Sequence, residues 1–281
     1  MAKTYRFENR TAVVTGAASG IGAALAQRLS ERGCHLALSD INADGLESVA
    51  EQLKSNDRRV TTKAFDVGDR DAIYRFADEV REAHGHADLV FNNAGVATMG
   101  TFEQVSEQDF DWLLGINLHG PIRMTRAFLP QLHQSNDAHI VNISSIFGMV
   151  APPGQTAYCA SKFGLLGFSD ALRHEFEDSS IGVTTVHPGG INTNIAAAAR
   201  VPDDSDEAEL EELQKSVQEL LVMPPVDAAD IILQAVTKRR PRVIVGSDAK
   251  RMAFLQRLMP FNYWKLIKRS IDTDALEVTR S

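Results

Sequence analysis

The chain has 281 residues, of which 44% are hydrophobic and 23% are charged, as in globular proteins with a single large core. Its formal net charge of −8 argues against nucleic-acid binding, because a phosphate backbone needs a basic face. Cys34 and Cys159 form no C-x-x-C motif, so neither a disulfide framework nor a metal site is indicated. The polar N-terminus and the lack of a long apolar run predict a cytoplasmic protein without a signal peptide or a membrane span.

Short β-branched runs alternate with helical stretches along the chain. We expect seven strands, at residues 11–15, 34–39, 60–65, 88–91, 139–144, 181–187 and 242–246. The expected helices include residues 21–32, 69–83, 121–134, 157–176 and 226–238. This alternation predicts an α/β, doubly wound (Rossmann-type) fold, in which a parallel sheet of about seven strands has helices on both faces. Its ligand crevice lies at the carboxyl ends of the strands.

A glycine-rich segment follows the first expected strand and opens a helix. Its glycines let the backbone turn tightly and approach a pyrophosphate, whose charge a helix N-terminus favours. The segment lacks the lysine of a P-loop, which disfavours nucleotide hydrolysis. A glycine turn without a ligand is the alternative. The candidate cofactor-binding residues here are Gly16, Ser19, Gly20, Ile21 and Gly22.

Polar groups follow the next three strands at the same edge. Asp40 ends the second strand, where a carboxylate can bind an adenosine ribose and repel a 2′-phosphate, so NAD is favoured over NADP. A solvated aspartate is the alternative. The third and fourth strands are followed by the further cofactor-binding candidates Asp66, Val67, Asn93, Ala94 and Gly95.

Tyr158 and Lys162 are four residues apart near the start of an expected helix, so their side chains share one face. A phenol titrates near ~10, and a nearby ammonium lowers that pKa. This pair alone is common on helix surfaces, but Ser145 follows the fifth strand, where its hydroxyl can bond a substrate oxygen. Asn117 lies where a helical stretch is expected to end.

The sixth strand is followed by Pro188, Gly189, Ile191 and Thr193, again at the crevice edge. Three histidines, His119, His139 and His187, have no carboxylate or nucleophile at triad spacing, so we interpret them as structural or solvated. Cys159 points about 100° away from Tyr158 around the helix, and its expected role is packing.

These ordered motifs, Thr-Gly-x-x-x-Gly-Ile-Gly, Asn-Asn-Ala-Gly, Ser, Tyr-x-x-x-Lys and Pro-Gly, resemble the short-chain dehydrogenase/reductase family over residues 8–247. The resemblance implies that Tyr158 is the general acid/base and that Lys162 binds the nicotinamide ribose and lowers the tyrosine's pKa. It further implies that Ser145 stabilises the reacting oxygen, Asn117 joins a proton relay, and Thr193 binds the nicotinamide carboxamide. Family members also assemble, which implies a homodimer or homotetramer.

Two segments depart from the strand and helix alternation of the expected domain at 1–247. Residues 201–222 hold seven acids between positions 203 and 212 and are either a substrate lid or a solvated acidic helix. Residues 248–281 form a basic-aromatic helical extension. This extension could cap the substrate pocket, contact another subunit, lie on an anionic membrane, or pack as an ordinary terminal helix.

The expected function is an NAD(P)-dependent oxidoreductase, with NAD favoured, that interconverts a hydrophobic secondary alcohol and its ketone. Residues 146–156 and 195–222 offer mainly apolar side chains to a pocket, which favours a hydrophobic substrate. One alternative is an NADP(H)-preferring carbonyl reductase. Another is a dinucleotide-sensing protein without useful catalysis, which the intact set of Ser145, Tyr158 and Lys162 disfavours.

Overall fold

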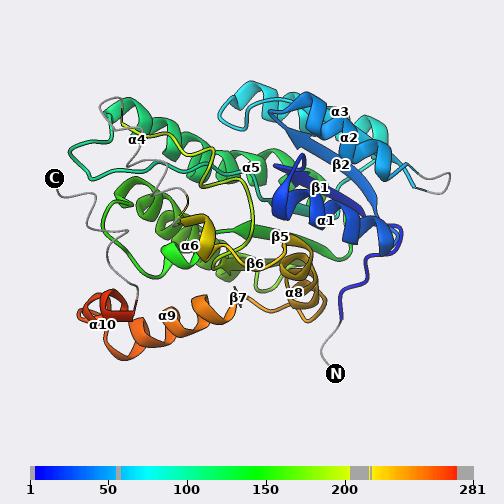
Figure 1. Ribbon diagram of the computed structural model, residues 1–281. Helices are drawn as coiled ribbons and strands as arrows, with labels where there is room; N and C mark the ends of the chain where they lie inside the picture. Colours follow the sequence, from blue (N-terminus) through cyan, green and yellow to red (C-terminus); the bar gives the residue numbers. More distant parts are fainter. Residues whose placement is uncertain (1–3, 55–57, 203–214, 216, 271–281) are drawn as a thin grey trace.

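A computed structural model describes residues 4–54, 58–202, 215 and 217–270. Seven strands form one sheet in the order β3-β2-β1-β4-β5-β6-β7, and every neighbouring pair is parallel (Figure 1). The strands are β1 (Thr11–Thr15), β2 (His35–Asp40), β3 (Val60–Ala64), β4 (Leu89–Asn92), β5 (Ala138–Ile143), β6 (Ile181–Pro188) and β7 (Arg242–Val245). The order reverses between β1 and β4, and this switch point is where such sheets bind ligands.

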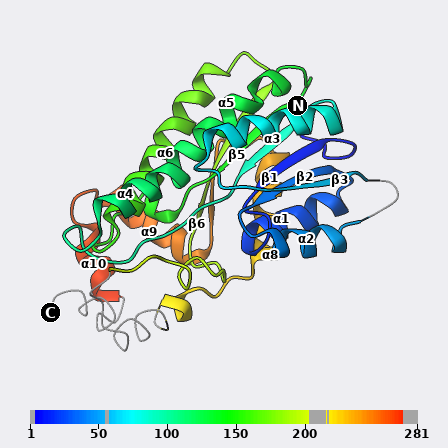
Figure 2. The same ribbon diagram turned by 90° about the horizontal axis from the view of Figure 1, so that it is seen from above.

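Helices cover both faces of the sheet (Figure 2). They are α1 (Gly20–Glu31), α2 (Ala43–Gln52), α3 (Arg70–His84), α4 (Glu107–Leu114), α5 (Gly120–Leu132), α6 (Thr156–Glu175), α8 (Pro225–Thr237), α9 (Ser247–Leu258) and α10 (Tyr263–Ser270). Strand side chains alternate between two cores: Val14 packs with α1 and α8, whereas Val13 packs with α3 and α5. The predicted fold class is therefore confirmed.

One helical boundary differs from the prediction. The chain runs from α4 into α5 through a π-helical turn, η1 (Gly115–His119), so Asn117 does not end a helical stretch as expected. The π-turn adds a residue to the hydrogen-bonded ring without breaking the helix, and such turns are frequent at functional sites. Helix α4 itself begins where the Ser106 side chain accepts a hydrogen bond from the Asp109 N–H (3.1 Å).

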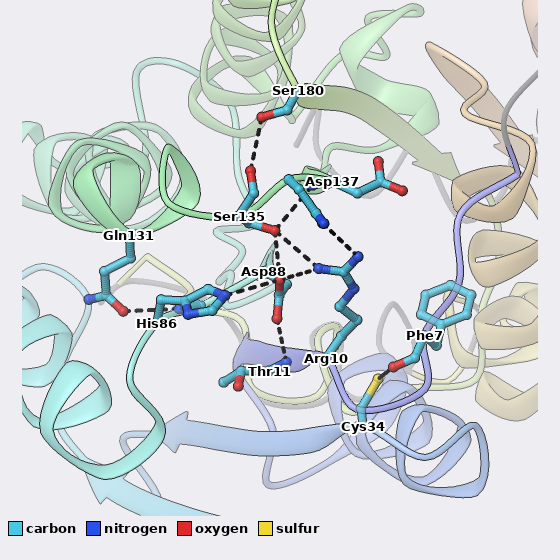
Figure 3. Close-up of polar contacts among 12 residues, drawn as sticks. Phe7, Arg10, Thr11, Cys34, His86, Asp88, Gln131, Ser135, Asp137 and Ser180 are labelled. Carbon is cyan, nitrogen blue, oxygen red and sulfur yellow. Dashed lines mark hydrogen bonds and ion pairs between the residues drawn. The ribbon is translucent and has the colours of Figure 1, made fainter.

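A buried carboxylate joins three segments at the edge where the strands begin (Figure 3). Asp88 is 3% exposed, and its Oδ1 accepts hydrogen bonds from Arg10 Nη1 (2.7 Å) and Ser135 Oγ (2.6 Å). Its Oδ2 accepts from the Thr11 N–H (2.9 Å). These contacts connect the starts of β1, β4 and β5, so a hydrogen-bonded ion pair stabilises this edge of the sheet.

The C-terminal helices pack against the loop that follows β5. Ala249 and Ala253 of α9 share a small core with Ile146 and Val150, and the Tyr263 hydroxyl accepts a hydrogen bond from the Ala151 N–H (2.9 Å). The boundary between the expected domain (1–247) and the expected extension (248–281) stays a prediction, and α9 contains residues from both sides of it. Most of the expected lid, residues 203–214 and 216, lies outside the described residues. Within the described ranges, the helices are all too short or too polar to cross a bilayer.

Candidate active site

The loops after β1 and β4 are joined by hydrogen bonds at the switch point. Asn93 Nδ2 donates to the carbonyl oxygens of Thr15 (2.9 Å) and Gly16 (3.1 Å). In return, Thr15 Oγ1 accepts from the backbone N–H groups of Asn93 and Ala94, both at 3.0 Å. The sequence predicts that Asn93 binds the cofactor, which stays a prediction, and in the structure its side chain holds the glycine loop in place.

The glycine loop leaves the N-terminus of α1 open. Gly16 and Gly20 have φ angles of +66° and +54°, a left-handed backbone that glycine tolerates. A Cβ on Gly22 would lie 1.9 Å from the Gly16 oxygen, so only glycine allows this close approach. The Ser19 side chain makes no capping hydrogen bond, and the first turn of α1 has no acid. The backbone N–H groups of this turn can therefore hold a phosphate.

Asp40 lies at the end of β2, beside this loop. Its Oδ2 accepts a hydrogen bond from the Ala18 N–H (2.9 Å), and its Oδ1 accepts from the Asn42 N–H (2.9 Å). A carboxylate has about four acceptor positions, so capacity remains for a sugar hydroxyl. Asp66, after β3, accepts from the Gly68 N–H (2.7 Å). Neighbouring Val67 is 8% exposed.

Tyr158, Lys162 and Ser145 come together at the start of α6. The Lys162 Nζ atom lies 5.5 Å from the centre of the Tyr158 ring and donates to the Ile143 carbonyl oxygen (3.1 Å). The Ser145 side chain lies beside the Tyr158 hydroxyl, near enough to affect its pKa. Ser144 instead turns to the helix backbone, where its Oγ donates to the Lys162 carbonyl oxygen (3.0 Å). This difference follows from the alternation of side chains at a strand end.

Burial determines the protonation of this cluster in the protein alone. Desolvation raises the pKa of Tyr158 to about 12, although its hydrogen bond with Ser145 acts in the opposite direction. Desolvation also lowers the pKa of Lys162, which is 3% exposed, to about 8. Lys162 is not among the groups that shift the pKa of Tyr158, so the expected lowering of that pKa by the lysine stays a prediction.

Asn117 sits in the π-turn, with its side chain fully buried. Its Oδ1 accepts from the Val96 N–H (2.8 Å), and its Nδ2 donates to the Val96 carbonyl oxygen (2.8 Å) and to Ser161 Oγ (3.3 Å). A Cβ on Gly95 would be 3.3 Å from Asn117 Oδ1 and 3.4 Å from Lys162 Nζ, so a side chain at position 95 would crowd both groups.

The loop after β6 closes the other side of the crevice. A Cβ on Gly20 would be 3.0 Å from Thr193 Cγ2, which places Thr193 beside the start of α1. Pro188 ends β6, and the Ile191 N–H donates to the Gly189 carbonyl oxygen (2.9 Å). Most of the predicted site residues thus line one sheet edge.

Two residues support the site without having been predicted to do so. Asp248, in the first turn of α9, accepts a hydrogen bond from the Gly190 N–H (2.8 Å) and so fixes the loop after β6. His187 is fully buried, and its Nδ1 bonds the Ser145 carbonyl oxygen (2.8 Å). Its burial lowers its pKa to about 4, so the ring is neutral and its Nδ1–H donates. Cys159 is buried, as expected for a packing residue.

Comparison with known proteins identifies the class. The family profile described as short chain dehydrogenase matches residues 10–204. SadH of Mycobacterium tuberculosis is 40% identical over 267 residues, which are 94% of this chain and 96% of SadH. The bovine dehydrogenase/reductase SDR family member 7B is 32% identical over 92% of this chain and 80% of its own length. The chain therefore belongs to the short-chain dehydrogenase family, whose members are oxidoreductases.

Solved structures agree with this assignment. A short-chain dehydrogenase/reductase from Burkholderia phymatum in complex with NAD superposes with a TM-score of 0.83 at 28% identity, covering 90% of this chain and 95% of that one. A metagenomic short-chain oxidoreductase in complex with NADP gives a TM-score of 0.70 at 30% identity, covering 86% and 98%. Dinucleotide cofactors of both kinds are thus bound by structural neighbours.

Proposed function

We propose that this protein is an NAD(H)-dependent oxidoreductase that interconverts a hydrophobic secondary alcohol and its ketone, with Tyr158 as the general acid/base. The observation that carries the proposal is the cluster of Tyr158, Lys162 and Ser145. It combines a hydroxyl beside a serine side chain and an ammonium 5.5 Å from the phenol ring. It lies at the same sheet edge as the glycine loop.

The residues of this edge fit a dinucleotide. The open N-terminus of α1 and the left-handed Gly16 would receive a pyrophosphate, and Asp40 would bind the adenosine ribose. The bound nicotinamide would donate or accept the hydride. Asp40 carries the charge that favours NAD, because a 2′-phosphate next to it would be repelled. Lys162 and Thr193 would hold the nicotinamide end, as the family resemblance implies.

The protein's own part in the reaction is to move one proton at the Tyr158 oxygen. A phenol with a pKa of about 12 is protonated at neutral pH, so it is ready to donate to a ketone oxygen that Ser145 also binds. The positive charge of Lys162 then stabilises the phenolate that remains. Asn117 and Lys162 both lie close to Gly95, and the family resemblance implies that they would return the proton from solvent.

The substrate side of the cluster is apolar. The Phe147 ring packs edge-on against Tyr158 at 6.2 Å between centroids. Met149 and the buried Val150 follow on the same loop. Leu220 and Val222, 59% and 76% exposed, come just before α8. Side chains of this kind gain free energy by covering an apolar skeleton, whereas they would leave a charged substrate without a partner.

The test is a panel of secondary alcohols and ketones, followed by nicotinamide absorbance with NAD and with NADP. Tyr158→Phe should lower turnover roughly 100- to 10,000-fold and leave NAD affinity unchanged, because only the transferable proton is lost. Tyr74→Phe, on α3, is the matched control and should keep full turnover. Substantial turnover by Tyr158→Phe would remove that residue from its role.

The same panel separates the alternatives. Faster turnover with NADP would identify a carbonyl reductase instead, and tight NAD binding with no turnover on any substrate would identify a dinucleotide sensor. The proposal includes a cytoplasmic location and a homodimeric or homotetrameric assembly, which cell fractionation and analytical sedimentation measure.

A further inference from the structure

The outward side of α9 and the turn after it carries large apolar side chains that contact water. Phe254 and Leu258 are each 62% exposed, and Phe261 is 93% exposed. Exposed basic residues lie among them on α9 and α10. We call this surface the basic-aromatic face, and its members are Lys250, Arg251, Phe254, Arg257, Leu258, Met259, Phe261 and Lys265.

The inward side of these helices is already packed. Ala249 and Ala253 are buried in the core beneath α9, and Ile267 of α10 is 2% exposed. The Tyr263 hydroxyl fixes α10 to the Ala151 N–H. Figures 1 and 2 both place α9 and α10 at the end of the molecule away from α2. The exposed aromatic rings are therefore presented by helices whose other side is held in place.

The charge of the basic-aromatic face determines which kind of partner it can bind. Residues 249–270 contain six basic residues and no acid, although the whole chain has a net charge of −8. A twofold contact between two copies of the face would set these basic residues against one another, which is unfavourable. An anionic lipid surface complements them instead, because its phosphates attract lysine and arginine while the apolar rings enter the headgroup region.

We propose that the basic-aromatic face docks the protein on an anionic lipid bilayer as a peripheral contact. The docked helices contact the loop of Phe147 and Met149 through the core beneath α9. If the function proposed above holds, this arrangement brings the substrate loop to the bilayer, where a hydrophobic alcohol or ketone is concentrated. Docking itself does not depend on turnover, so the two proposals can fail separately.

The experiment is co-sedimentation of the full chain with phosphatidylcholine vesicles, with and without phosphatidylglycerol. We expect the protein to bind only the anionic vesicles and to be released by salt, because the Debye length shortens. The double variant Phe254→Ser/Phe261→Ser and the variant Lys265→Glu should each bind at least fivefold more weakly. Phe102→Ser removes an aromatic ring that is 68% exposed elsewhere and should bind as the wild type does.

NAD affinity, measured by titration, serves as the folding control, since none of the substituted residues lines the cofactor edge. Absence of binding to anionic vesicles by the wild type would overturn the proposal. Equal vesicle binding by the double variant would also overturn it. If the wild type does not bind vesicles and the double variant forms a smaller oligomer than the wild type, the basic-aromatic face is a subunit contact instead.

Discussion

Gly22→Ala tests whether the glycine loop is set by close packing. The added methyl would lie 1.9 Å from the Gly16 carbonyl oxygen and 2.6 Å from Asn93 Nδ2. Ordinary contact requires about 3.5 Å, so the loop and the helix must separate by roughly 1.5 Å. The hydrogen bond from Asn93 to Gly16, at 3.1 Å, joins the groups that would be pushed away.

Opposing effects determine how much Gly22→Ala changes the free energy of unfolding. Within a helix, alanine is favoured over glycine by about 1 kcal/mol. Overpacking costs about 1–3 kcal/mol, and loss of a buried hydrogen bond costs about 1–3 kcal/mol more. We therefore expect Gly22→Ala to lower the free energy of unfolding by about 1–5 kcal/mol. We also expect NAD affinity to fall at least tenfold, since the displaced loop is the one that meets the pyrophosphate.

Gly167→Ala is the matched control. Gly167 lies in α6, and a Cβ there would meet no atom within 4 Å, so only the helical preference remains. This variant should be about 0.5–1 kcal/mol more stable than the wild type and should bind NAD normally. Urea unfolding and titration of NADH fluorescence measure both quantities. If Gly22→Ala is as stable as the control variant and binds NADH as well as the wild type does, close packing is not the reason for a glycine at position 22.

Three further outcomes follow from individual side chains. Asp40→Asn removes the charge at the ribose position and should lower the NAD to NADP ratio of kcat/KM by about tenfold or more, and an unchanged ratio would exclude the charge argument. Burial lowers the pKa of His139 to about 3 and of His187 to about 4. A histidine of the unfolded chain has a pKa of about 6.5, so below that pH the unfolded chain binds more protons than the folded protein does. The free energy of unfolding should therefore be unaffected by these histidines above that pH and should fall toward pH 4, by roughly 3 kcal/mol for His187 alone. Urea unfolding midpoints that do not change with pH would contradict this. Asp248→Ala frees the Gly190 N–H and should weaken NAD binding severalfold in titrations, whereas Asp248→Asn should restore most of it.

Local signals in the sequence were enough to predict the strands and the loops at the cofactor edge. Glycines at positions 16, 20 and 22 follow a buried strand directly, and the Tyr158–Lys162 spacing places both side chains on one helix face. Such features depend on neighbours within a few residues, and parallel strands then bring the loops to a common edge. The fold class follows from the same regular alternation.

Other features depend on contacts that no local pattern records. Asp248 accepts a hydrogen bond from Gly190, which is 58 positions away in the sequence. The local sequence indicates only that Asp248 is an acidic residue in the first turn of a helix. The π-turn at Asn117 changes the hydrogen-bond register while the apolar periodicity continues. The raised pKa of Tyr158 results from how deeply the finished fold buries it, which spacing to Lys162 cannot reveal.

The two free cysteines make the protein suitable for site-specific labelling. Both are buried, and burial raises the pKa of Cys34 to about 12 and that of Cys159 to about 11. Since the thiolate is the form that attacks maleimides, both native thiols should stay unmodified near neutral pH while the fold is intact. A single cysteine introduced on an exposed helix, as in Phe254→Cys, would then carry a fluorophore at one known position without removal of any native residue.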